Sequence, residues 1–183
     1  MSKILTIDYE TSDSRVNFGQ VLQAGIVISD DKLNIQSRHE LRCRLKSTVI
    51  PSIGACLVHK IPVNILKNSN KSHYEMVLEH YNLIKDNTPS VVMGFNQVAF
   101  DIEFYRRMLY KSLIPDVYQT NTNGNRHLDI LNVSRAAKFA DNDSIQTILN
   151  EKNRVSFKLS DLSTANKINN GTSHDAITDC LNS

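Results

Sequence analysis

The hydrophobic positions in the first quarter of the chain form two apolar runs and one alternating stretch, each of which predicts a β-strand. An apolar run at 3–7 predicts a buried strand, and a longer run at 20–29 predicts a second one. Residues 38–46 alternate between apolar and basic side chains and predict a third strand. The polar stretch DDKLN, at 30–34, predicts the turn between the second and third strands. We therefore expect an antiparallel meander at the start of the fold.

The third predicted strand places a row of basic side chains on one face. Its apolar positions are Leu41, Cys43 and Leu45, and its basic positions are Arg42, Arg44 and Lys46. Such a row is a candidate contact for nucleic acid, but charged side chains also occupy the wet side of edge strands. We favour the edge strand, because solvated faces commonly carry charge.

Beyond residue 62 the apolar spacing becomes mostly helical. The predicted helices are 72–86, 99–113, 157–168 and 173–183, the predicted strand is 90–96, and 127–139 predicts a short strand that enters a helix. Pro115 ends the second of these helices, and Ser173 is the expected N-cap of the last. A meander followed by alternating helices and short strands predicts an α/β fold with a mixed sheet.

Composition limits the classes of protein to consider. The 183 residues suit one domain, and 21 basic against 19 acidic side chains leave a net charge of +2, so a polyanion would need a local patch. Three widely spaced cysteines argue against a disulfide framework or a zinc site. The sequence has no apolar run of membrane-spanning length, so we expect a cytoplasmic protein. The stretch TNTNGN, at 120–125, is expected to be a mobile loop.

Two carboxylates follow the first apolar run one residue apart. Asp8 and Glu10 would point to the same side of a strand, where like charges repel unless a cation lies between them. Further along, Asp101 lies early on a predicted helix and Asp179 lies in the last one, after His174. These residues come from separate elements, and the order in which they occur is more informative than any one of them.

This set of residues suits phosphodiester hydrolysis. Two divalent cations roughly 3.5–4 Å apart activate water and stabilise the leaving oxygen. Mg²⁺ prefers carboxylate oxygens and water, and the four carboxylates could supply them. A histidine such as His174 is suited to accept the proton of the attacking water.

Each member also has an ordinary explanation. An Asp-x-Glu pair often arises by chance, and Asp101 would be favourable in a first helical turn without any metal. We accept the helix-dipole explanation for Asp175. The histidines without partner spacing, interpreted as surface or core residues, are His59, His73, His80 and His127.

The order of the motifs resembles the DEDDh class of 3′–5′ exonucleases. These motifs are D-x-E on the first strand, an Asp after G-x-N-x-x-x-F, and H-x4-D near the end. Within that class the chain is most similar to the bacterial exonuclease I branch, which degrades single-stranded DNA. The matching stretches are IDYET, IPSIGACLVHKI, GFNQVAFDIEFYRRMLY, LDILNVSRA, SFKLSDLSTAN and SHDAITD. The resemblance implies a ribonuclease H-like fold, a mixed five-stranded sheet flanked by helices, with residues 1–183 forming the exonuclease domain.

The resemblance also implies roles for individual residues. Asp8, Glu10, Asp101 and Asp179 match the carboxylates that bind two Mg²⁺ ions, with Mn²⁺ as an alternative, and His174 matches the general base. The expected nucleic-acid contacts are Glu10, Arg106, Tyr118, Arg135 and Lys158. A solvated helix position is an equal alternative for Arg106. Asp129 matches a recurrent acidic position, and we interpret it as a supporting residue rather than a ligand.

The chain departs from the family pattern at three places. Lys158 replaces an Arg, which turns a bidentate phosphate contact into a point charge, and Lys60 replaces a Gly, which would alter a turn. The family continues with SH3-like and helical domains, whereas this chain stops at Ser183, so we expect a truncated protein in which Asp179 is loosely held. A single-strand-binding protein would dock through the absent regions, and we expect a monomer.

Three functions remain open from the sequence. The favoured one is a 3′–5′ exodeoxyribonuclease that releases 5′-mononucleotides from single-stranded DNA during repair or recombination. The second is a DEDDh exoribonuclease that resembles oligoribonuclease, and DNA and RNA substrates would separate the two because the 2′-hydroxyl differs. The third is a truncated domain that binds single strands without cleaving them.

Overall fold

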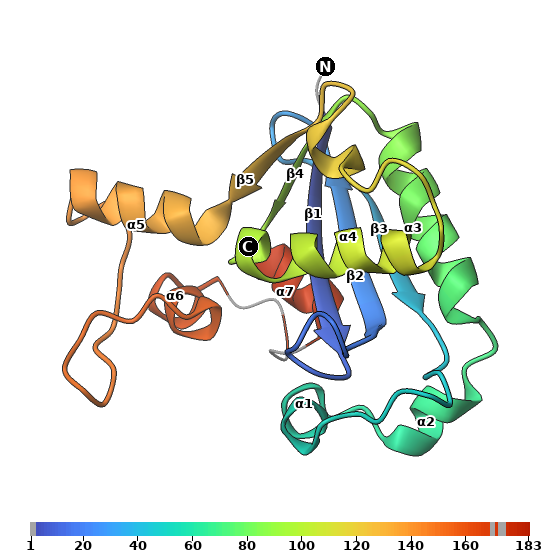
Figure 1. Cartoon of the computed structure of the whole chain (residues 1–183). Helices are drawn as coiled ribbons and strands as arrows, with labels where there is room; N and C mark the ends of the chain where they lie inside the picture. Colours follow the sequence, from blue (N-terminus) through green and yellow to red (C-terminus); the bar gives the residue numbers. More distant parts are fainter. Residues whose placement is uncertain (1–2, 169–170, 172–174) are drawn as a thin grey trace.

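A mixed five-stranded sheet forms the centre of the protein, seen here in a computed structural model that describes residues 3–168, 171 and 175–183 (Figure 1). The strands are β1 (Lys3–Thr11), β2 (Val21–Ser29), β3 (Ile35–Arg42), β4 (Ser90–Gly94) and β5 (Arg126–Asp129). Their spatial order is β3-β2-β1-β4-β5. The β1, β2 and β3 strands run antiparallel as a meander, whereas β4 and β5 are parallel to β1. The predicted α/β fold with a mixed sheet is confirmed.

The central strand is longer than its apolar run. Leu5 and Ile7 are fully buried, and β1 continues to Thr11 because it pairs with β2 along that whole length, with a register shift between Glu10 and Thr11. Asp8 therefore lies opposite Gly25 inside the sheet and not in a loop after it. The alternation of a strand then separates two faces, one with the core residues and one with the carboxylates.

Helices cover both faces of the sheet (Figure 1). The helices are α1 (Ile53–His59), α2 (Val63–Asn68), α3 (His73–Asp86), α4 (Asp101–Lys111), α5 (Ile130–Ala140), α6 (Leu159–Ala165) and α7 (Ala176–Asn182), with short 3₁₀ turns η1 (Gln97–Ala99) and η2 (Gln119–Asn121). In Figure 1, α3 and α4 lie on one face of the sheet and α7 on the other, whereas α5 and α6 lie to the side, beyond β5. Met76 of α3 and Tyr105 of α4 belong to the same buried cluster as Leu5 and Ile7. The α7 helix packs against β1 and β2.

The third strand confirms the edge position and corrects its predicted length. Leu41, Cys43 and Leu45 are buried, and Arg42, Arg44 and Lys46 are exposed, as the alternation predicted. The regular β3 strand nevertheless ends at Arg42. Beyond it the backbone N–H groups of Arg44 and Leu45 donate to the carbonyls of Lys71 and Leu66, so this segment leaves the sheet and follows the α2 region.

The start of the last helix differs from the expectation. α7 begins at Ala176, and its N-cap is Asp175, whose side chain accepts a hydrogen bond from the Thr178 N–H. The expected cap, Ser173, lies outside the described residues. An aspartate at this position satisfies a free N–H and also interacts favourably with the helix dipole, which confirms the ordinary explanation of Asp175.

The segment 120–125 is anchored and is not a loop without fixed contacts. Thr120 and Asn125 are buried. The Asn125 side chain accepts a hydrogen bond from the Ser90 N–H and donates one to the Gln119 carbonyl. These contacts anchor both ends of the stretch, which leads into β5, whereas Asn123 and Gly124 at its tip are exposed.

Two short helices occupy a region for which the sequence predicted no element. The N-cap of α1 is Ser52, and the helix ends at Lys60, which adopts a left-handed conformation with φ 55°. Glycine is usual in that conformation, and here Lys60 adopts it. Among the described residues, no helix is long and apolar enough to cross a membrane.

Candidate active site

Three carboxylates from the two ends of the chain meet on one side of β1. Asp8 and Glu10 point to the same face of the strand, and α7 brings Asp179 beside them. One oxygen from each of the three carboxylates lies within 4.8 Å of the other two. The repulsion inferred from the sequence is therefore present in the structure, and it involves a third residue as well.

The position of Asp179 depends on close packing of α7. Ala176 and Cys180 are buried, and the Cys180 thiol lies 3.4 Å from the carbonyl oxygens of Thr6 and Gly25. Gly25 lets the helix backbone approach the sheet directly, since a Cβ there would lie 2.5 Å from the Ala176 carbonyl. Contrary to the expectation of a loosely held residue, the short helix fixes Asp179 through these contacts.

The fourth predicted carboxylate lines the same hollow without joining the group of three. The hollow has a volume of about 470 Å³, and Asp8, Glu10, Asp101 and Asp179 all line it. Asp101 begins α4 and is 3% exposed. Its Oδ1 is buried without a hydrogen-bond partner in the described part of the chain.

Burial and mutual repulsion shift the acidities of these groups. Burial raises the pKa of Asp8 from 3.8 to about 8, with a further contribution from the charge of Asp179. Burial likewise raises the pKa of Glu10 to about 8, helped by Asp8. The pKa of Asp101 lies well above its usual value, again because of burial and then the charge of Asp8. In the absence of a cation, the site therefore resists full ionisation.

The arrangement fits a hard divalent cation. Convergent carboxylate oxygens and a buried carboxylate oxygen without a partner are what such an ion requires, and the ion would remove the repulsion that raises these pKa values. Asp8, Glu10 and Asp179 would be its ligands, and Asp101 lines the same hollow. His174, the predicted general base, lies outside the described residues.

Asp129 supports the loop that leads to Asp101. Its Oδ1 accepts hydrogen bonds from the N–H groups of Asn96 (3.0 Å) and Leu131 (3.1 Å), and its Oδ2 accepts one from Val98 (3.2 Å). It also caps α5 and does not line the hollow. The geometry agrees with the interpretation of Asp129 as a supporting residue.

Replacing Asp129 by alanine should loosen this loop. Three N–H groups lose their acceptor, and we expect the free energy of unfolding to fall by about 2–3 kcal/mol. Urea denaturation followed by circular dichroism would measure it, with Asp141→Ala as the control because Asp141 accepts its hydrogen bond in an exposed turn. Equal stability of the two variants would contradict the supporting role.

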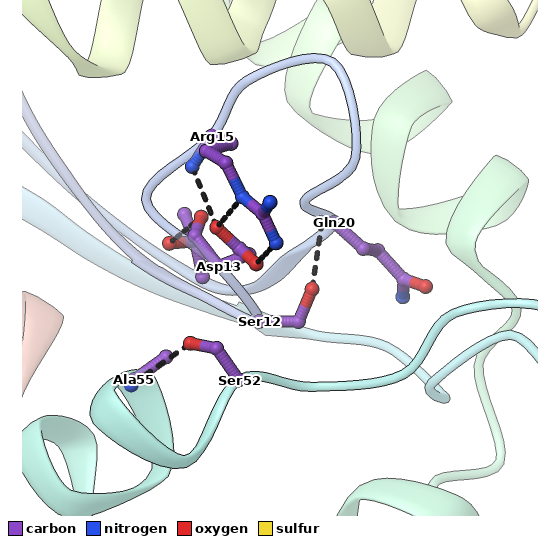
Figure 2. Close-up of polar contacts among 7 residues, drawn as sticks. Ser12, Asp13, Arg15, Gln20, Ser52 and Ala55 are labelled. Carbon is purple, nitrogen blue, oxygen red and sulfur yellow. Dashed lines mark hydrogen bonds and ion pairs between the residues drawn. The ribbon is translucent and has the colours of Figure 1, made fainter.

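A network of polar contacts lies beside the hollow and includes Ser52, which lines it (Figure 2). The Gln20 N–H donates to the Ser12 hydroxyl, and the Ser52 N–H donates to the Ser12 carbonyl, both at 2.8–2.9 Å. Asp13 is held by Arg15 in the same turn. Because Ser52 caps α1, these contacts tie α1 to the end of β1 that carries the carboxylates.

Comparison with known proteins shows what this arrangement resembles. Exodeoxyribonuclease I of Buchnera aphidicola from Acyrthosiphon pisum is 28% identical over 176 residues, which is 96% of this chain and 42% of the relative. Among solved structures, Escherichia coli exonuclease I with a dT13 oligonucleotide superimposes with a TM-score of 0.93 at 24% identity, over 100% of this chain and 39% of that one. A zinc-bound form of the E. coli protein with single-stranded DNA gives a TM-score of 0.92 at 25% identity, over 100% of this chain and 39% of that one.

The chain is similar to exodeoxyribonuclease I. No protein-family model matches it. The chain spans about two fifths of the length of the exodeoxyribonuclease I proteins reported above. The resemblance read from the motifs and the ribonuclease H-like fold expected from it are therefore confirmed, and the sheet has the predicted five strands.

Of the predicted nucleic-acid contacts of the exodeoxyribonuclease I pattern, Glu10 lines the hollow, and the other four lie in two places outside its lining. The Arg106 guanidinium lies 4.9 Å from the centre of the Tyr118 ring and also pairs with Glu103. The Arg135 guanidinium lies 5.9 Å from the Phe157 ring, next to Lys158. Each pair combines a cation with an aromatic ring, a combination suited to phosphates and bases.

One residue of the hollow was missed as a site residue. His59 was interpreted as a surface or core histidine and is indeed buried, but it also lines the hollow beside the carboxylates. Its Nδ1 accepts a hydrogen bond from the Ile61 N–H, and its Nε2 has no partner among the described residues. The sequence signal was the matching stretch IPSIGACLVHKI, which contains His59, but no helix was predicted there.

Proposed function

We propose that this chain is the nuclease unit of a 3′–5′ exodeoxyribonuclease that releases 5′-mononucleotides from single-stranded DNA. The observation that carries the proposal is the convergence of Asp8, Glu10 and Asp179 in a hollow that Asp101 also lines. The likeness to exodeoxyribonuclease I, some of whose solved structures contain oligonucleotides, supports it.

The cofactors proposed are two Mg²⁺ ions, with Mn²⁺ as an alternative. When bound, such ions activate the attacking water and stabilise the leaving oxygen of the phosphodiester. The acidic residues would hold the ions and would not act as nucleophiles. Their raised pKa values support this role, because groups that resist ionisation alone become ionised beside a cation.

The remaining residues would position the strand and transfer the proton. His174 would accept a proton from the attacking water. The Arg106–Tyr118 pair would hold a phosphate and stack on a base, and Arg135 with Lys158 would contact the backbone further along. We also propose a monomer that acts in the cytoplasm in DNA repair or recombination, as the domain of a longer protein that meets a single-strand-binding protein through its other domains.

Cleavage of a 5′-labelled oligothymidine would test the proposal. With Mg²⁺ we expect products that shorten from the 3′ end, and Asp101→Asn or His174→Ala should slow the reaction by about 10²–10⁴-fold. Lys32→Gln, an exposed change in the β2–β3 turn, serves as the control. An oligonucleotide left intact by folded protein in both Mg²⁺ and Mn²⁺ would contradict the assignment, and faster cleavage of an RNA of equal length would favour an exoribonuclease.

A further inference from the structure

A buried hydrogen bond joins α4 to the short turn η2. The Tyr105 hydroxyl donates to the side-chain oxygen of Gln119, and these two residues are 0% and 2% exposed. The other end of the Gln119 amide donates to the Tyr81 carbonyl at 3.1 Å. One side chain therefore connects η2 to both α3 and α4. Because both partners are buried, neither could turn to water if this hydrogen bond were lost.

The backbone of Gln119 is held as firmly as its side chain. Its N–H donates to the Asp116 carbonyl at 2.9 Å, and its carbonyl accepts a hydrogen bond from the Asn125 side chain at 2.7 Å. Both backbone groups and both ends of the side-chain amide of this residue are therefore paired. A buried polar network in which every member is paired makes its surroundings rigid, so the residues next to Gln119 have little freedom.

The exposed Arg106–Tyr118 pair adjoins this hydrogen bond along both segments. Arg106 follows Tyr105 in α4. Tyr118 precedes Gln119 and is the N-cap of η2. The Tyr118 ring is 56% exposed, and the Arg106 guanidinium lies 4.9 Å from its centre. The same two elements are therefore joined twice, once by the buried hydrogen bond and once by the exposed pair.

The strengths of the two contacts indicate which one positions the other. An exposed cation–π contact favours the paired arrangement only about two- to five-fold. Breaking one side of a buried hydrogen bond is unfavourable by about five- to 150-fold. The turn itself adds little, because hydrogen bonds in a 3₁₀ turn have poor geometry. The position of the Tyr118 ring therefore depends on the buried hydrogen bond more than on its own contact with Arg106.

One donor of the Arg106 guanidinium lacks an acceptor. Its Nη1 donates to Glu103 at 2.8 Å, whereas its Nε is buried without a hydrogen-bond partner in the described part of the chain. Buried donors are normally paired, so this one points to an acceptor that a ligand supplies. A phosphate oxygen suits a guanidinium, and the Tyr118 ring suits an unpaired base. Both groups can be bound at once only if ring and guanidinium keep a fixed arrangement.

We propose that Tyr105 and Gln119 are positioning residues, which hold the Arg106–Tyr118 pair in the arrangement that receives a single strand. Both are buried and neither lines the carboxylate hollow, so they act only through the exposed pair. The identity of the ligand rests on the proposed function, whereas the dependence of the exposed pair on the buried hydrogen bond does not. Loss of this hydrogen bond should weaken strand binding and leave the chemical step unchanged.

The fluorescence of Tyr118→Trp tests the link between the two contacts without any strand. The chain contains no tryptophan, so the introduced indole reports on this position alone. In this background we expect Tyr105→Phe to lower the anisotropy of the indole and to increase its quenching by acrylamide about two-fold or more. Tyr110→Phe, which changes an exposed residue of the same helix, is the control. Unchanged anisotropy and quenching in Tyr105→Phe would overturn the link.

A double-mutant cycle tests the consequence for strand binding, measured with a fluorescently labelled oligothymidine in EDTA. We expect Tyr118→Ala to weaken binding about five-fold or more and Tyr105→Phe to weaken it about three-fold. In the Tyr118→Ala background, Tyr105→Phe should change the affinity by less than about 1.5-fold, because no ring remains to be positioned. In cleavage assays with Mg²⁺, the loss in Tyr105→Phe should appear in KM and not in kcat.

Two further variants separate positioning from a general loss of stability. Gln119→Met removes the acceptor of the hydrogen bond and should weaken binding about as much as Tyr105→Phe. Ile26→Val removes a buried methyl group from β2, lowers stability comparably and should leave strand affinity unchanged. Equal losses in Ile26→Val and Tyr105→Phe, or equal effects of Tyr105→Phe with and without the Tyr118 ring, would overturn the proposal. Wild-type affinity in Tyr118→Ala would do the same. Binding in EDTA without cleavage in Mg²⁺ contradicts only the proposed nuclease.

Discussion

Asp8→Asn should abolish cleavage and, in the metal-free chain, make the protein more stable above neutral pH. The asparagine keeps the shape of the side chain and removes a charge from a buried, crowded position. The two effects have one cause: the charge that would bind the cation is unfavourable for folding when the cation is absent.

The sign of the pH dependence follows from the raised pKa values. Folding favours the protonated form of Asp8, so its contribution to stability is present below its ordinary pKa of 3.8 and is lost as the pH rises to about 8. Glu10 changes in the same direction between 4.5 and about 8. The metal-free chain should therefore lose stability across this range, and Asp8→Asn should be more stable by about 2–4 kcal/mol at pH 8.

Urea denaturation in EDTA at pH 5, 7 and 8 would measure this effect. Asp31→Asn is the control, because Asp31 is exposed in the β2–β3 turn and should leave the pH dependence unchanged. Excess Mg²⁺ should stabilise the wild-type chain and should stabilise Asp8→Asn much less. A variant that is less stable than wild type at pH 8 without metal would contradict the electrostatic explanation.

Gly25→Ala should damage both folding and activity. The added Cβ would lie 2.5 Å from the carbonyl carbon and oxygen of Ala176, so α7 must move away from β2. We expect a loss of about 2–4 kcal/mol in the free energy of unfolding. The clash is with backbone atoms, which cannot relieve it by changing rotamer as a side chain can. Since α7 carries Asp179, cation affinity should fall as well.

Gly54→Ala provides a matched control for stability. No atom lies within 4 Å of a Cβ at Gly54, which is in the helical α1 segment, so the same added methyl group should leave stability unchanged or slightly higher. Thermal unfolding of the two variants, with Mg²⁺ titration of each, would separate displacement of α7 from a general effect of the substitution. A Gly25→Ala chain with wild-type stability and Mg²⁺ affinity would refute the role assigned to this contact.

The hydrophobic pattern predicted most of the sheet but not all of the helices. Apolar runs marked β1, β2 and β4, and period-two alternation marked β3, because the side chains of these strands meet a core. α1 and α2 have only seven and six residues, and His59 and Leu66 are their buried members. Helices this short are stabilised by their surroundings and leave little pattern in the sequence.

The relative positions of site residues on one strand were predictable from the sequence, whereas those of residues on different elements were less so. That Asp8 and Glu10 point to one side follows from the geometry of a strand. That Asp179 joins them depends on Gly25 allowing α7 to approach, which no local pattern expresses. The resemblance to the exonuclease motifs supplied that link.

The candidate cation site exists only when α7 is packed against β1, so cation affinity depends on complete folding of the chain. The proposed ligands come from segments at opposite ends of the described chain, and the sheet and α7 must be in place before Asp8, Glu10 and Asp179 meet. Closing so long a loop is entropically costly, so a partly folded chain has no high-affinity site. Calorimetric stoichiometry of divalent-ion binding would then report the native fraction of a preparation, independently of whether any strand is cleaved.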